Sequence, residues 1–213
     1  MSDEQRRFRR AAHAAFACAA LNAGASAAML LFLRPGLPPS TQRLDFIQQS
    51  TLPWRASWAL WMITAFSLAA FYFSFQRATG GPRIAVWIAL AGLLPDLGAE
   101  AVYIVRYPSL AAADLEGHDR LCAILSATLG NGAYTAAWHL LTRGAGLPRA
   151  SLLLSVPGIA AGYLMALSGT VHWVPGLAVS TAVALPAFTL WALVAGRFCW
   201  KKAGEAATMS RHV

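Results

Sequence analysis

Charge is what this sequence has least of. Only 12% of its 213 residues are Asp, Glu, Lys or Arg, whereas an ordinary soluble domain has about 25%. Apolar residues make up 57% of the chain, and they come in long blocks separated by short gaps that contain Arg and Pro. This composition excludes an ordinary soluble domain and is typical of a protein that crosses a membrane several times.

Several catalytic and cofactor motifs are also missing. GxSxG, HExxH and a Gly-rich phosphate loop do not occur, so serine hydrolases, metalloproteases and nucleotide-driven enzymes lack their working parts here. No lysine lies within an apolar block, so a Schiff base has no attachment point. The three cysteines include no CxxC pair and indicate neither a disulfide framework nor a thiolate zinc site.

Haem needs two histidines at one depth on different helices. His118 with His172, and His13 with His139, are the pairs that the sequence offers. However, His118 and His139 fall on one predicted helix at a separation of about 31 Å, which leaves each of them at a membrane edge. The sequence therefore predicts no haem and no other cofactor.

Six apolar blocks are long enough to cross a bilayer, at about 30 Å each. The fold that they predict is all-α, a polytopic transmembrane bundle of six helices in a single integral domain over residues 1–213. The first block also has the basic start of a signal peptide, but its apolar stretch continues through MLLFL to Arg34, so we expect a retained span. The predicted spans are Ala11–Leu33, Ala56–Phe75, Ile84–Val105, Leu121–Leu141, Ala150–Thr170 and Pro175–Phe198.

Basic residues predict the orientation, because Lys and Arg are retained on the cytoplasmic side. With the N-terminus inside, twelve basic residues are cytoplasmic and five are not, so both termini are predicted to be cytoplasmic in a multi-pass inner-membrane protein. The net charge of +8 is spread along the membrane flanks, so the bilayer rather than nucleic acid is the expected partner. The twelve are Arg6, Arg7, Arg9, Arg10, Arg77, Arg83, Arg143, Arg149, Arg197, Lys201, Lys202 and Arg211, and the five are Arg34, Arg43, Arg55, Arg106 and Arg120.

Two acidic residues interrupt the third span. Asp96, Glu100 and Tyr103 are spaced i, i+4 and i+7, which places them on one stripe of a helix. A carboxyl group facing lipid costs a few kcal/mol, so this stripe should face the bundle interior or a wet cavity. Two adjacent buried carboxyls can share or exchange a proton. Two alternatives remain: the pair is structural, bonded to Asn131, Tyr134 or a buried Arg, or the span ends early and Glu100 lies among headgroups.

Other polar residues are predicted at the same outer height. His118 and Asp119 precede the fourth span and His172 ends the fifth, so an outward-opening pocket is expected. Its chemistry suits a divalent ion, but the spacing matches no metal motif and we expect no metal. The site candidates, with Asn131 added from the middle of the fourth span, are Asp96, Glu100, Tyr103, Asn131, His172, His118 and Asp119.

Trp54, Trp58 and Trp61 follow at helical spacing near the start of the second span. Indole rings favour the headgroup level, so this stripe is interpreted as an interface anchor rather than a ligand cage.

Three functions fit these residues. The leading hypothesis is a small inner-membrane protein that binds a small solute or ion at the acidic site and translocates it with proton exchange. The second is a membrane-embedded enzyme that acts on a lipid or isoprenoid-like substrate with a carboxyl general acid or base. The third is a non-catalytic accessory or assembly subunit of a membrane complex, and a homo-oligomer also remains open. No residue is assigned a catalytic role from sequence.

Overall fold

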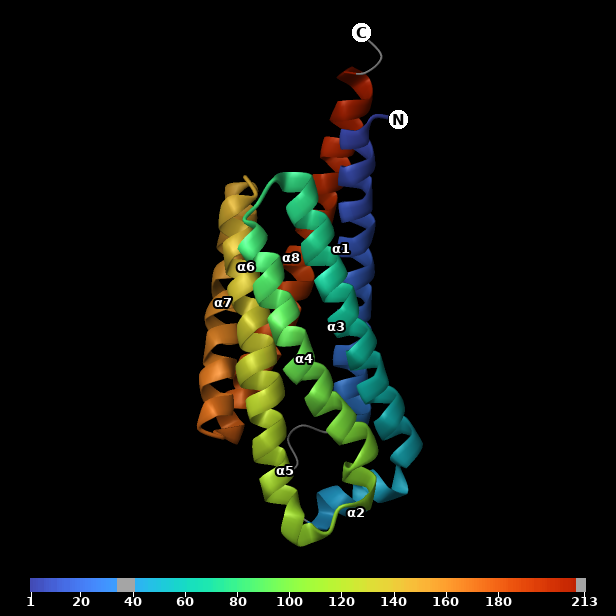
Figure 1. Ribbon diagram of the computed structural model, residues 1–213. Coiled ribbons are helices and arrows are strands. Elements are labelled where there is room, and N and C mark those ends of the chain that lie inside the picture. The colour runs from blue at the N-terminus through green and yellow to red at the C-terminus, as the bar shows by residue number, and fades with distance from the viewer. Residues whose placement is uncertain (34–40, 210–213) are drawn as a thin grey trace.

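The computed structural model describes residues 1–33 and 41–209, and this part of the chain is helical without any strand. Figure 1 shows the helices running along one long axis, with α1 beginning and α8 ending at the same end. We call this the terminal end and the opposite one the α2 end. The elements are α1 (Asp3–Ala28), η1 (Met29–Leu33), α2 (Thr41–Gln49), α3 (Thr51–Thr79), α4 (Arg83–Val105), η2 (Tyr107–Ser109), η3 (Ala112–Asp114), α5 (Leu115–Cys122), η4 (Ala123–Asn131), α6 (Gly132–Gly144), α7 (Arg149–Thr170) and α8 (Val174–Met209).

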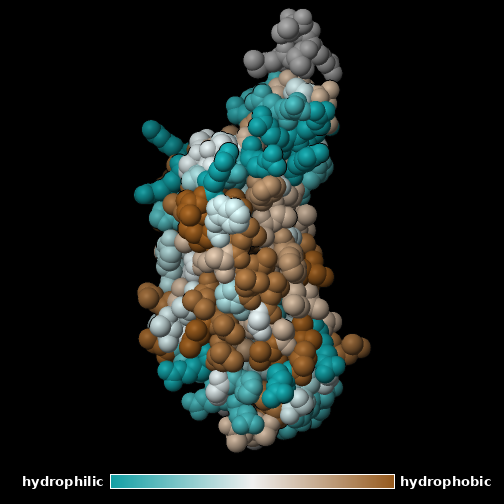
Figure 2. Space-filling view, viewed as in Figure 1, coloured by the Kyte–Doolittle hydropathy of each residue, from teal (hydrophilic) through white to brown (hydrophobic). Residues whose placement is uncertain are grey.

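Five helical segments are long and apolar enough to cross a membrane. Figure 2 shows the matching surface, a belt of hydrophobic side chains between two hydrophilic ends. The prediction of an all-helical chain with membrane-spanning helices is therefore supported for five of the six predicted spans. The five segments are Asp3–Phe32, Thr51–Thr79, Arg83–Ser109, Ser151–Thr170 and Val174–Thr208.

The predicted span Leu121–Leu141 forms a continuous helical run with an irregular middle. α5, η4 and α6 follow one another without a break, and η4 is a π-helix of nine residues. Each residue of a π-helix adds less length than a residue of an α-helix, and such segments are often found at functional sites. None of the three pieces alone reaches the length of a span.

Helix ends differ from the predicted boundaries because hydrogen bonds, not bilayer thickness, decide where a helix stops. α1 begins at Asp3 instead of Ala11, since the Ser2 hydroxyl accepts a hydrogen bond from the Gln5 N–H at 3.2 Å and caps the helix. α8 continues past Phe198 into a charged segment. The predicted positions of Arg34 and Arg211 lie outside the described residues.

The segment between the third and fourth predicted spans is largely helical. η2, η3 and the start of α5 occupy it. Between the first and second predicted spans, Thr41–Gln49 forms the short helix α2. α2 packs against η2 and α3 through Leu44 and Ile47, which are buried with Trp54 and Tyr107.

Small residues on α1 bring the backbones close at the terminal end. Ala11, Ala15 and Ala19 are buried between α1 and its neighbours α8 and α3, and a Cβ built on Gly196 of α8 would lie only 3.1 Å from the Ala15 Cβ. This close approach agrees with the packing expected for an Ala-rich span. Large aromatic side chains fill the adjoining core, namely Phe71, Tyr72, Phe75, Trp138, Phe188 and Trp191. The tightly packed half of the bundle is therefore the terminal half.

Candidate functional site

A cavity of about 520 Å³ lies in the bundle on the side of the aromatic core that faces the α2 end. Residues of α1, α3, α4, α8 and the α5–η4–α6 run line it. Six of the seven residues predicted for the site are among its lining residues, and they come from separate parts of the chain. They are Asp96, Glu100, Tyr103, Asp119, Asn131 and His172.

The acidic pair is enclosed by protein. Asp96 is 6% exposed and Glu100 is 2% exposed, and they lie one helical turn apart on α4. The expectation that neither carboxyl faces lipid is confirmed by this burial. Pro95 lies within α4, which continues through it to Val105.

Asp96 is held by the π-helical segment. The Ser126 hydroxyl of η4 donates a hydrogen bond to Asp96 Oδ1 at 2.7 Å, and Asn131 Nδ2 donates to the Ser126 carbonyl at 3.1 Å. The two backbones meet closely here, because a Cβ on Gly130 would lie 2.8 Å from the Asp96 Cβ. Asn131 thus supports the group that holds Asp96 and does not bind a carboxyl itself, contrary to one structural alternative.

One carboxyl oxygen of Glu100 receives no hydrogen bond from the described part of the chain. Its Oε2 atom is buried and has no hydrogen-bond partner in the described part of the chain. The ion pairs within residues 1–33 and 41–209 are Arg6–Asp3, Arg43–Asp119 and Lys202–Glu205, so neither acid of the pair has a cationic partner there. The Tyr134 hydroxyl lies beside Asp96 but makes no hydrogen bond of acceptable geometry. A buried carboxyl that nothing neutralises is costly when charged, so Glu100 favours a proton or a bound cation.

Asp119 forms an ion pair with Arg43. Arg43 Nη1 donates to Asp119 Oδ2 at 2.6 Å, and the Tyr107 hydroxyl donates to Asp119 Oδ1 at 2.6 Å. Burial lowers the pKa of Arg43, but the charge and hydrogen bond of Asp119, together with Tyr103 and Tyr107, outweigh burial and leave that pKa above its ordinary value. This pair ties α2 to α5 at one end of the cavity. Nothing in the sequence indicated it, since its members lie 76 positions apart.

Aromatic side chains of α3 and α4 form another part of the cavity lining. Trp58 stacks on Tyr103 with ring centroids 3.8 Å apart, and Trp54 Nε1 donates to the Tyr103 carbonyl at 2.7 Å. Trp54 is 1% exposed, so its interpretation as an interface anchor is wrong. The indole nitrogens of Trp58 and Trp61 are buried without a described partner, and both side chains line the cavity.

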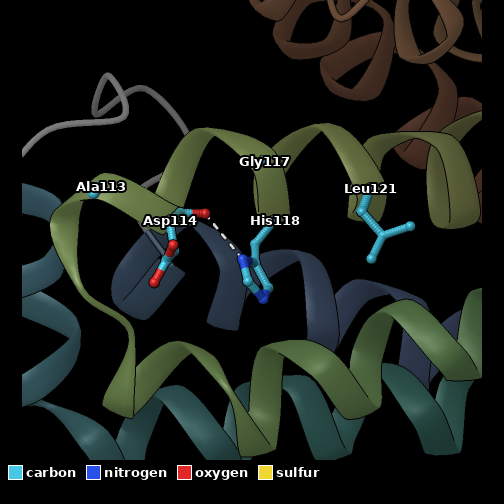
Figure 3. Close-up of a pocket in the computed structure, with 5 residues that line it drawn as sticks. All are labelled: Ala113, Asp114, Gly117, His118 and Leu121. Carbon is cyan, nitrogen blue, oxygen red and sulfur yellow. Dashed lines mark hydrogen bonds between the residues drawn. The ribbon is translucent and has the colours of Figure 1, made fainter.

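The two histidines predicted at the outer height, His118 and His172, lie in different pockets. His118 lies in a different surface pocket of about 320 Å³, where its Nδ1 donates to the Asp114 carbonyl at 2.9 Å (Figure 3). The prediction that His118 lines the acidic pocket is therefore wrong: it faces a different side of α5 from the neighbouring Asp119. His172 does line the main cavity, and its positive φ of 51° marks the turn between α7 and α8.

The cavity reaches the molecular surface between two helices. Leu30, 73% exposed, and Val174, 38% exposed, both line it. Deeper in the bundle, Asn22 Nδ2 of α1 donates to Thr189 Oγ1 of α8 at 2.7 Å. Figure 1 shows α1 and α8 together near the terminal end and separating toward the α2 end. The opening thus lies beyond the Asn22 contact, flanked by apolar side chains.

No group of three or more His, Cys, Asp or Glu side chains within the described ranges is arranged to hold a metal ion. Comparison with known protein families, with curated proteins and with solved structures gives no match. The chemistry of the cavity is therefore the basis for a function.

Proposed function

We propose that the protein spans an inner membrane six times with both termini in the cytoplasm. The continuous run from Leu115 to Gly144 supplies the remaining span, with η4 accommodated by packing against α4 and α7. The described basic residues support the orientation, since eleven lie toward the terminal end and four toward the α2 end. The eleven are Arg6, Arg7, Arg9, Arg10, Arg77, Arg83, Arg143, Arg149, Arg197, Lys201 and Lys202, and the four are Arg43, Arg55, Arg106 and Arg120.

We further propose that the cavity binds a small solute and exchanges it for a proton at Glu100 and Asp96. The observation that carries this proposal is the buried Glu100 Oε2, which lies in a cavity wall without a partner. An ionised carboxyl buried without a partner is costly, and protonation removes this cost by making the group neutral. A positively charged ligand removes the same cost when the proton leaves, because it pairs with the carboxylate. Competition between ligand and proton for one group is the simplest form of proton-coupled exchange.

A second function has support from the opening between α1 and α8. A pocket that reaches the apolar flank, has aromatic walls and contains a carboxyl suits an enzyme whose substrate is lipid-like, with Glu100 or Asp96 as general acid or base. An accessory subunit would be expected to have both acids bonded and no cavity, so the free oxygen of Glu100 favours the first two functions. Turnover of a lipid substrate, absent in Glu100→Gln, would favour the enzyme over the exchanger.

Dicyclohexylcarbodiimide tests the site without a known ligand, because this apolar reagent reacts with protonated carboxyls in apolar surroundings. We expect it to modify Glu100 in the protein reconstituted in lipid, and to modify it less as the pH is raised through the titration of the site. Peptide mass spectrometry measures the labelled fraction at each pH. Glu116, which is exposed on α5, is the internal control and should stay unlabelled. Unlabelled Glu100 at every pH would overturn the proposed exchange.

A further inference from the structure

We infer that the ligand is an amphiphilic organic cation, with an ammonium-type head beside Glu100 and Asp96 and an apolar tail directed to the opening between α1 and α8. This inference rests on the proposed function, because it takes the cavity to be a ligand site. It adds the sign of the ligand's charge, its size class and the side from which it enters the cavity.

The charge of the ligand follows from the charges that line the cavity. Glu100 and Asp96 lack a cationic partner in the part of the chain that the structure describes. Arg43 also lines the cavity, but Asp119 already neutralises it. An anion would meet two acids and no free positive charge, and a neutral ligand would leave the charge of an ionised acid unbalanced. A cation balances that charge.

The lining residues favour an organic head over a metal ion. A bare divalent ion needs six or more oxygen ligands, or a compact set of nitrogen and sulfur ligands, and no such cluster is found in the described ranges. Trp58, Trp61 and Tyr103 instead add aromatic rings to the lining of the cavity that contains both acids. Aromatic rings next to carboxylates are the groups that recognise alkylammonium ions, through cation–π attraction.

The shape of the site suits a ligand with a tail. The lining of the cavity includes apolar side chains of η1, which continues α1, and of α8, namely Met29, Leu30, Val174, Leu177 and Ala178. Leu30 and Ala178 are exposed, so a tail lying between η1 and α8 would reach exposed apolar side chains at the surface. When the cation binds, Glu100 releases its proton to water and the charge in the cavity stays balanced.

Hexyltrimethylammonium and its neutral carbon isostere 2,2-dimethyloctane test this inference, because they share shape and differ in charge. Equilibrium dialysis against the protein in lipid nanodiscs, with empty nanodiscs as the blank, measures binding of each. We expect the cation to bind at least tenfold more tightly than the isostere, and to lose that advantage in Glu100→Gln but not in the exposed control Glu116→Gln. The bound cation should also slow carbodiimide labelling of Glu100 in the unmodified protein, a readout that does not depend on how the variant folds.

Equal binding of the two probes, or no binding of the cation while the carbodiimide still labels Glu100, would overturn the inference and leave the exchange site standing. Failure of the labelling itself would remove the proposed function as well. The two failures are therefore distinguishable in one set of samples.

Discussion

Proteoliposomes that carry the double change Asp96→Asn and Glu100→Gln are expected to lose all proton movement driven by hexyltrimethylammonium. Both amides keep the shape of the acids but cannot release a proton, and no other acid of the described chain lines the cavity except Asp119. Asp119 is held by Arg43 and Tyr107, so it cannot replace them. A pH dye inside the vesicles, followed after the cation is added outside, measures the effect.

In vesicles with the double variant, the internal pH should change at the same rate as in protein-free vesicles. In vesicles with the unmodified protein, it should change well above that rate. Asp114→Asn with Glu116→Gln is the matched control, because it removes two exposed acids from the adjoining α5 region and should leave the rate unchanged. Proton movement in the double variant at the rate of the unmodified protein would show that these acids carry no protons.

Replacing Gly158 and Gly162 of α7 together by Ala is expected to cause the largest loss of stability. A Cβ at Gly158 would lie 2.6 Å from the Ala187 Cβ and would collide with the Trp138 ring, while one at Gly162 would lie 2.7 Å from Thr135 Cγ2. Overpacking of this kind costs about 1–3 kcal/mol at each site. Since these two glycines let α7 lie close to α6, the variant should unfold at a clearly lower temperature in detergent, as measured by tryptophan fluorescence.

Gly24→Ala with Gly98→Ala is the control for that experiment, because a Cβ at either helical position meets no atom within 4 Å. Alanine favours helix over glycine by up to about 1 kcal/mol, so this pair should be as stable as the unmodified protein or more so. If the Gly158 and Gly162 variant unfolds at the same temperature as this control, the close packing of α7 is not as described.

Much of the helical architecture could be predicted from the sequence because the low charge and the long apolar blocks act over whole segments. The enclosure of Asp96 and Glu100 was predictable for a similar reason. The cost of a carboxyl in lipid is large enough to decide which face of a helix points into the bundle. The spacing of Asp96, Glu100 and Tyr103 then places them on one wall.

The rest of the site depends on contacts between distant residues. The Ser126 hydroxyl that donates to Asp96 lies in the π-helical segment η4, which no hydrophobic pattern encodes. The direction of the Trp54 ring depends on its bond to the Tyr103 carbonyl. His118 and Asp119 are neighbours in the chain but lie about 100° apart around a helix, so predicting one pocket for both was an error that helical geometry alone could have prevented.

The most direct measurement of the central claim is infrared spectroscopy of the protein in lipid, following the C=O stretch of protonated carboxyls in a pH series and after transfer to D₂O. The account predicts such a band, a shift of it in D₂O because water or a ligand path reaches the cavity, and its loss in Glu100→Gln. A spectrum with no protonated carboxyl at any pH where the protein is folded, or a band that is unchanged in the Glu100→Gln variant, would contradict it.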